Sequence, residues 1–261
     1  VDVAKQAADM ILADDNFATI EKAIEEGRGV YENIRKSVIF LLSSNLGELM
    51  TMFVAVAMGL ASPLKSSHIL WINLITDSLP ALALGVDKND SKSLMRCPPR
   101  KASESLFARG GIACTLFYGA LITVIGLAAF LVLPCGILAA EGELVGNPFT
   151  WVERLRELMS REQILAKSQT YAFTVLGMCQ LYHAIGMRDV QKSVFAMSPR
   201  DNLLMVAACI IGFILQFAVT EIPFLIRAFG TSHLSGQEWL LLSVLAAFPL
   251  FAHEVIVLFT K

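Results

Sequence analysis

Six apolar stretches, each about as long as a membrane-crossing helix, alternate with polar segments along this chain. A helix needs about 20 mostly apolar residues to cross a bilayer. The first two stretches are joined by a short link around Pro63, so we expect them to form a hairpin. The pattern predicts an all-α, polytopic membrane bundle of six transmembrane helices, over residues 37–61, 68–86, 110–134, 168–187, 202–221 and 239–259.

The segment before the first stretch is polar and predicts a separate helical element. Residues 14–16 offer N-cap side chains before Phe17, and apolar residues recur at helical spacing over 20–24. Gly27 and Gly29 each cost about 1 kcal/mol relative to Ala in a helix. We nevertheless expect this helix to continue into the first apolar stretch as a stalk.

Composition agrees with a membrane protein. The chain has 261 residues, of which 55% are hydrophobic and 17% charged, whereas a soluble domain carries roughly 25% charged residues. An ordinary soluble enzyme is therefore excluded. The net charge of -2 gives no indication of nucleic-acid binding, and the five cysteines are scattered without zinc-ligand spacing.

The charge distribution predicts an orientation. If the polar N-terminal segment lies in the cytoplasm, 15 of the 21 Lys and Arg residues fall on that side of the membrane. Cytoplasmic loops carry an excess of these residues. Both termini are therefore expected in the cytoplasm, which agrees with the even number of spans.

Polar side chains cluster inside the first two spans. Asn45 and Glu48 share one face of the first, and Asn73, Thr76 and Asp77 share one face of the second. Charged groups at such depth cost at least roughly 2.5–3.5 kcal/mol each, so they are expected to face protein, water or an ion. The two acidic residues on neighbouring helices favour an ion site.

The residue types restrict the ion. All five side chains offer oxygen, and an oxygen-only set suits calcium, magnesium or manganese. Pro80 removes a backbone hydrogen bond, so local unwinding over 75–80 is expected to expose further carbonyl oxygens. The alternative interpretation is that these groups only join helices by hydrogen bonds. That is the better interpretation of Gln180, an isolated amide in the fourth span.

Several motifs then resemble one family, the P-type ATPases of the calcium-pump branch. The resemblance covers essentially the whole chain and is most specific through about residue 100. It is carried by residues 42–48 (LSSNLGE) and 70–85 (LWINLITDSLPALALG), with 4–17 (AKQAADMILADDNF) and 95–100 (MRCPPR) in support.

The resemblance implies a ligand set for a transported cation. It assigns Asn45, Glu48, Asn73, Thr76 and Asp77 as ligands, with calcium as the favoured cation. It also implies that Gln180 occupies a ligand position at which two-calcium members carry Glu. The site then has one negative charge fewer, which leaves the number of calcium ions and the identity of the cation open.

The resemblance also implies a division of the chain. The six spans become the fifth to tenth helices of a ten-helix pump. Its parts are the end of the phosphorylation domain (1–16), a cytoplasmic stalk helix (17–36), the ion-binding hairpin (37–86), a cytoplasmic loop (87–109) and a C-terminal support domain of four helices (110–261).

The chain carries no phosphorylation or nucleotide-binding motif. The resemblance therefore implies that ATP and magnesium bind to a missing N-terminal half of the same protein, and that this chain is not catalytic alone. The expected setting is a lipid bilayer, as a prokaryotic plasma-membrane protein. The alternatives are a pump for manganese, sodium or potassium, or protons, a secondary transporter or channel, and a non-catalytic membrane assembly domain.

Overall fold

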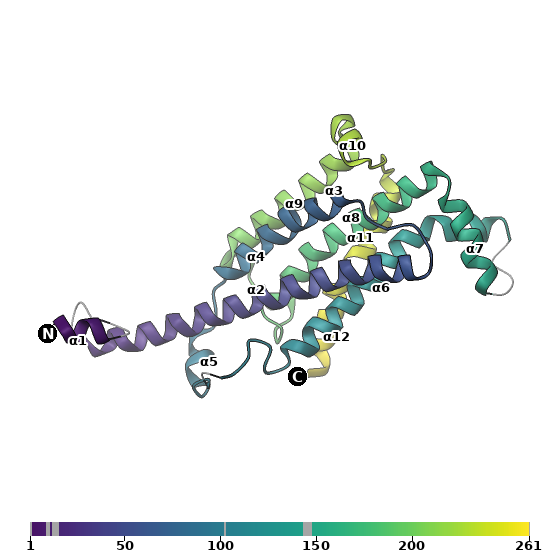
Figure 1. Cartoon of the computed structure of the whole chain (residues 1–261). Helices are drawn as coiled ribbons and strands as arrows, with labels where there is room; N and C mark the ends of the chain where they lie inside the picture. The colour runs from purple at the N-terminus through teal and green to yellow at the C-terminus, as the bar shows by residue number, and fades with distance from the viewer. Residues whose placement is uncertain (1, 9–10, 12–15, 102, 143–147, 261) are drawn as a thin grey trace.

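The computed structural model describes residues 2–8, 11, 16–101, 103–142 and 148–260, and Figure 1 shows their arrangement. The described residues form helices and connecting loops without a strand, which confirms the predicted all-α class. The helices are α1 (Asp2–Ala7), α2 (Phe17–Ala57), α3 (Ser66–Trp71), the π-helix η1 (Ile72–Asp77), α4 (Ser78–Gly85), α5 (Ser91–Arg96), α6 (Gly111–Ala140), α7 (Pro148–Met159), α8 (Glu162–Met187), the 3-10 turns η2 (Val194–Ala196) and η3 (Pro199–Asp201), α9 (Leu203–Glu221), α10 (Pro223–Phe229), α11 (Gly236–Ala246) and α12 (Phe248–Thr260).

Helix α2 joins the expected stalk and the first apolar stretch without a break. It begins at Phe17, as predicted, and the Asn16 side chain caps it by accepting a 3.0 Å hydrogen bond from the Ala18 amide. The other two expected capping residues, Asp14 and Asp15, lie outside the described residues. Gly27 and Gly29 remain helical, so the continuity of the long helix outweighs their low propensity.

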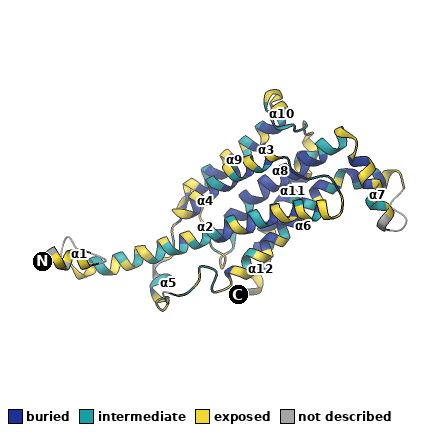
Figure 2. Cartoon of the chain, viewed as in Figure 1, coloured by how far each residue is buried: buried dark blue, intermediate teal, exposed yellow. Residues whose placement is uncertain are grey.

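Helix α8 forms the centre of the bundle. It packs against α2, α4, α6, α9, α11 and α12, and Figure 2 shows it buried among them. Along the adjacent α2–α6 contact, small residues allow the helices to approach closely: a Cβ at Gly119 would lie 2.7 Å from Leu46.

Four helical segments are long and apolar enough to cross a membrane: α2, α6, α9 and the α11–α12 segment Gly236–Phe259. The other two expected spans correspond to α3–η1–α4 and to α8. The former is divided by a π-helix, and the latter carries many polar side chains that face its neighbours. The six-span count therefore remains a prediction, whereas the length and composition of four helices support an integral membrane protein.

Helix α2 ends at Ala57 and α8 begins at Glu162, so both differ from the limits of the expected spans. Two further differences involve prolines. Helix α6 continues through Pro134 to Ala140, because a proline inside an apolar helix can be accommodated when neighbouring groups satisfy the freed carbonyl. The last stretch divides at Ala247 into α11 and α12, just before Pro249. The proline lacks the amide hydrogen needed to continue the upstream helix.

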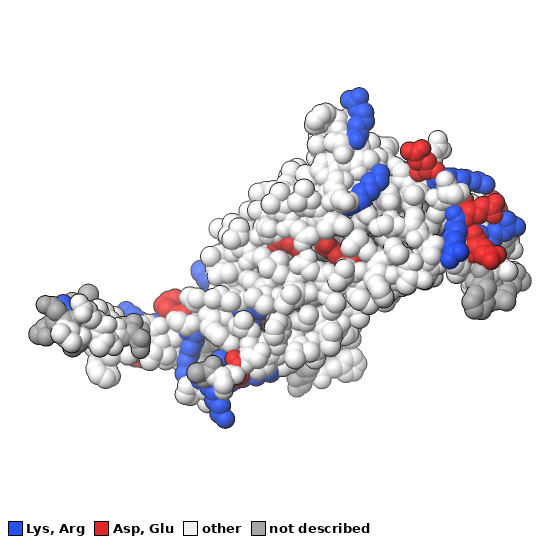
Figure 3. Space-filling model, viewed as in Figure 1, with Lys and Arg blue, Asp and Glu red and all other residues white. Residues whose placement is uncertain are grey.

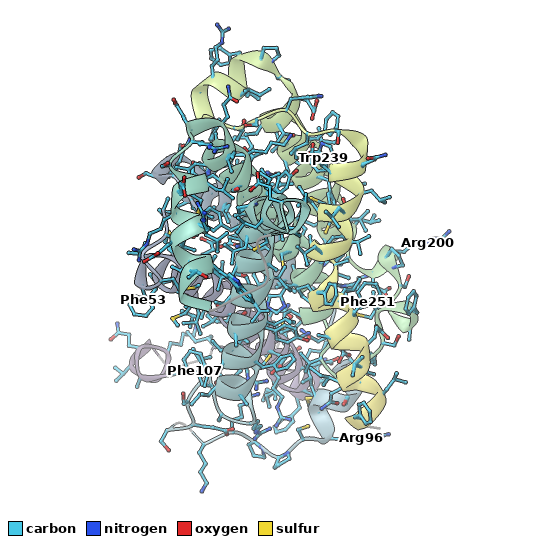
Figure 4. All side chains as sticks on the ribbon, turned by 90° about the vertical axis from the view of Figure 1, so that its right-hand side faces the viewer. Phe53, Arg96, Phe107, Arg200, Trp239 and Phe251 are labelled. Carbon is cyan, nitrogen blue, oxygen red and sulfur yellow. The ribbon has the colours of Figure 1, made fainter. Side chains whose placement is uncertain are left out.

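Most charged residues on the surface gather at the two ends of the molecule. In Figure 3, Lys, Arg, Asp and Glu concentrate at the two ends of the molecule, with a white band between them in which some acidic atoms are visible. Phe53 and Phe251 point outward from opposite sides of the bundle in Figure 4 and are 63% and 59% exposed. An exposed apolar belt of this kind matches a lipid-facing surface.

Candidate cation-binding site

The π-helix η1 positions the acidic end of the predicted hairpin site. The expected unwinding over 75–80 does not occur: η1 covers Ile72–Asp77, and α4 continues through Pro80. The Ser78 hydroxyl donates a 2.8 Å hydrogen bond to the carbonyl oxygen of Asn73, which helps to satisfy the altered backbone. π-helical turns inside α-helices are frequent at functional sites.

A three-residue network joins the two predicted halves of the site through the central helix. Glu48 on α2 is 3% exposed and accepts a short hydrogen bond from the Gln180 side-chain amide of α8. The Gln180 carbonyl oxygen in turn accepts a 3.0 Å hydrogen bond from the Thr76 hydroxyl of η1. Gln180 therefore joins residues from α2 and η1 that the sequence predicted to act together.

Asp77 is the exceptional member of the site. It is 1% exposed, and neither of its carboxylate oxygens has a hydrogen-bond partner among the described residues. Removing a carboxylate from water is strongly unfavourable unless a cation, a proton or hydrogen-bond donors compensate. The Asp77 carboxylate is thus available to a hard cation, which matches the chemistry expected from the sequence.

The two asparagines are oriented by their own helices. The Asn45 amide nitrogen donates to the Leu41 carbonyl oxygen at 2.8 Å, and the Asn73 amide nitrogen donates to the Ile69 carbonyl oxygen at 2.9 Å. These bonds leave the side-chain carbonyl oxygen of each residue free to accept from another group. Both asparagines are half-buried, and no hydrogen bond between described residues joins either of them to Asp77.

The acidic content of the site is small. Among the described residues, no group of three or more His, Cys, Asp or Glu side chains lies close enough together to hold a metal ion. Any bound cation would therefore depend on carboxylates complemented by neutral amide, hydroxyl or carbonyl oxygens.

Sequence reasoning missed a second polar cluster, at the other end of α4. Asp87 is 5% exposed and forms an ion pair with Arg188, whose Nη2 lies 3.2 Å from Oδ1. Asn202 donates to the same oxygen at 2.9 Å, and Asn33 of α2 donates to the Asp87 backbone carbonyl, also at 2.9 Å. Each of these residues falls near a predicted span end, where charge is ordinary, so spacing alone gave no signal.

Comparison with known proteins identifies the relatives. Residues 61–259 match the family described as cation transporting ATPase, C-terminus. The chain is 42% identical over 260 residues to Calcium-transporting ATPase 1 of Bacillus cereus, covering 100% of the chain and 28% of that protein. It is 37% identical over 250 residues to Calcium-transporting ATPase of Bacillus subtilis, with 96% and 25% covered.

The resemblance extends to plants. Calcium-transporting ATPase 3, endoplasmic reticulum-type, of Arabidopsis thaliana is 33% identical over 252 residues, covering 91% of the chain and 24% of that protein. The chain thus spans about a quarter of the length of these curated relatives.

The chain is an apolar helical bundle with buried carboxylates in its interior, and it is an integral membrane protein. The match over most of its length is decisive for the family. The chain belongs to the P-type cation-transporting ATPases and corresponds to their C-terminal portion.

Proposed function

We propose that this chain is the transport part of an ATP-driven P-type pump that exports calcium from the cytoplasm. The observation that carries the proposal is Asp77, a buried carboxylate without a hydrogen-bond partner. It lies next to Thr76, which is linked through Gln180 to Glu48. An oxygen-rich site with two acidic residues suits a hard divalent cation.

In this proposal the chain crosses the membrane six times, as the fifth to tenth helices of the pump, with both termini in the cytoplasm. The ligands are Asn45, Glu48, Asn73, Thr76, Asp77 and Gln180. ATP and magnesium bind elsewhere in the full-length protein, and another helix of that protein completes the cation site. A prokaryotic plasma membrane is the proposed location.

Transport would follow from movement of α2. The helix runs unbroken from Phe17, at its cytoplasmic end, to the segment that holds Asn45 and Glu48. Phosphorylation elsewhere in the pump would displace the cytoplasmic end and tilt the whole helix. Glu48 would then move relative to Asp77, so that the cation loses ligands and leaves on the far side. Protons would compensate the emptied carboxylates, because nearby buried carboxylates resist full ionisation.

The experiment is ATP-dependent phosphorylation of the full-length pump at increasing calcium concentration. Asp77→Asn should abolish the calcium dependence, because the neutral amide removes the charge from the site. Asp201→Asn, in the exposed turn η3, is the matched control and should behave as the unmodified pump. Full calcium dependence in Asp77→Asn would remove Asp77 from the site and contradict the proposal.

Substituting manganese, sodium, potassium or protons for calcium in the same assay tests the rival cations. A membrane assembly domain that only holds helices together would gain no thermal stability from any of them, whereas a ligand that binds the folded state raises its melting temperature.

A further inference from the structure

Gln216 of α9 carries a buried polar atom that the proposed ligand set does not use. The residue is 0% exposed, and its Oε1 atom has no hydrogen-bond partner among the described residues. Its amide nitrogen makes only a long, 3.5 Å hydrogen bond to the Thr174 hydroxyl of α8. A buried carbonyl without a donor is unfavourable, so its presence requires an explanation.

The neighbourhood of Gly177 shows where this oxygen lies. A Cβ at Gly177 would lie 3.0 Å from Gln216 Oε1 and 3.7 Å from the Thr76 methyl group. The absence of a side chain on α8 therefore leaves room for the Gln216 oxygen beside Thr76. Gly177 lies one turn before Gln180 on the same helix face, so the oxygen is directed to the side of α8 that already holds the polar network.

We infer that Gln216 supplies a carbonyl oxygen to the transported cation, from the α9 side of Thr76. The inference rests on the proposed function, because it adds a ligand to that site. A neutral amide oxygen is an ordinary ligand for calcium, which takes six to eight oxygens. It would also extend the site to a fourth element, beyond α2, η1 and α8.

A packing role predicts different behaviour. The Gln216 amide would then rotate so that its oxygen accepts from the Thr174 hydroxyl, and its contribution would be to stability alone. Cation affinity would not depend on the oxygen at this position, only on the shape of the side chain.

The test uses the full-length pump and titrates calcium in the phosphorylation assay. Gln216→Leu keeps a similar volume and removes the oxygen, and should weaken apparent calcium affinity about tenfold, as loss of a group supporting a metal site does. Gln216→Glu retains an oxygen and should keep the affinity at or above that of the unmodified pump. Gln169→Leu is the matched control, because Gln169 is a buried α8 glutamine that donates to the Ser62 carbonyl oxygen, away from the site.

A second measurement, the rise in melting temperature on adding calcium, reports binding without activity. It should shrink in Gln216→Leu and persist in Gln169→Leu. Unchanged affinity and an unchanged melting shift in Gln216→Leu would overturn the inference.

If Gln216→Leu does not fold, Gly177→Ala decides the question. The added methyl group crowds the Gln216 oxygen, so a fall in calcium affinity supports the inference and an unchanged affinity overturns it. Asp77→Asn separates this inference from the proposed function. If Asp77→Asn loses calcium dependence while the Gln216 and Gly177 variants keep the calcium affinity of the unmodified pump, only the role of Gln216 is refuted.

Discussion

Two buried aspartates flank helix α4, and their surroundings are opposite. Asp87, after its last turn, accepts hydrogen bonds from Arg188 at 3.2 and 3.3 Å and from Asn202 at 2.9 Å. Asp77, immediately before its first residue, has no hydrogen-bond partner for either carboxylate oxygen within the described chain. Both side chains are at most 5% exposed, so burial alone does not distinguish them.

The difference separates a carboxylate that protein groups hold from one that has no donor among the described residues. The hydrogen-bond partners of Asp87 are side chains of the protein itself. They join the end of α4 to the ends of α8 and α9. Asp77 has no such partner among the described residues, and in the proposed function the transported cation takes that place. Replacing each aspartate by asparagine should therefore change the free energy of unfolding in opposite directions.

The largest expected effect is at the fixed pair. Arg188→Met removes the cation facing Asp87, and should lower the free energy of unfolding by about 3 kcal/mol because it leaves a buried carboxylate without its counter-charge. Thermal melting of the full-length pump in detergent measures it. Arg200→Met is the control, since Arg200 lies on the exposed periphery (Figure 4). Equal melting temperatures for the two variants would contradict a structural role for the pair.

Asn202→Ala should have the next largest effect. It removes the donor to Asp87, the 2.8 Å hydrogen bond to the Ala83 carbonyl oxygen and the N-cap of α9. The expected loss is about 2 kcal/mol. Asn202→Asp keeps the cap but places a carboxylate beside Asp87, so it should melt no higher than Asn202→Ala. Recovery of the full melting temperature in Asn202→Asp would show that only the cap matters.

Gln180→Met should weaken apparent calcium affinity about tenfold, equivalent to about 1.4 kcal/mol. Its loss removes the amide donor of Glu48 and one of the two acceptors of the Thr76 hydroxyl, which also bonds to the Ile72 carbonyl oxygen. The proposed ligands are then held less firmly in position. Calcium titration of phosphorylation measures the change, with Gln169→Met as the control on the same helix. An unchanged titration would limit Gln180 to packing.

The smallest expected effect has the opposite sign. In the presence of a calcium chelator, Asp77→Asn should raise the free energy of unfolding by about 1 kcal/mol, because it removes a buried carboxylate that lacks donors. Asp87→Asn should lower it in the same measurement. A lower melting temperature for both variants would mean that Asp77 has a structural partner after all.

The sequence was sufficient to predict features that depend on local order. Residues 14–16 before Phe17 predicted where α2 begins, and the apolar run after the stalk predicted that the helix would continue. Helix α9 likewise begins and ends within one residue of its predicted span. Caps and hydrophobic period act between near neighbours, so one chain contains the whole signal.

Features that depend on packing were not predictable in the same way. Helical spacing placed Glu48 and Asp77 on faces of two helices, but it could not show that Gln180 would join Glu48 to Thr76. No sequence pattern indicated a role for Gln216, because a single amide in an apolar stretch is ordinary. The π-helix also required the tertiary environment, since Pro80 alone is compatible with a break, a kink or a wider turn.

The unbroken course of α2 has a mechanical consequence. Its 41 residues correspond to a rod of about 60 Å, at about 1.5 Å of rise per residue. In such a rod, axial position and rotational phase are coupled. One extra residue between Phe17 and Asn33 would displace the outer end by about 1.5 Å and turn it by about 100° relative to Glu48. In the proposed function, the length of this segment therefore sets the direction in which movement of the outer end of α2 displaces Glu48.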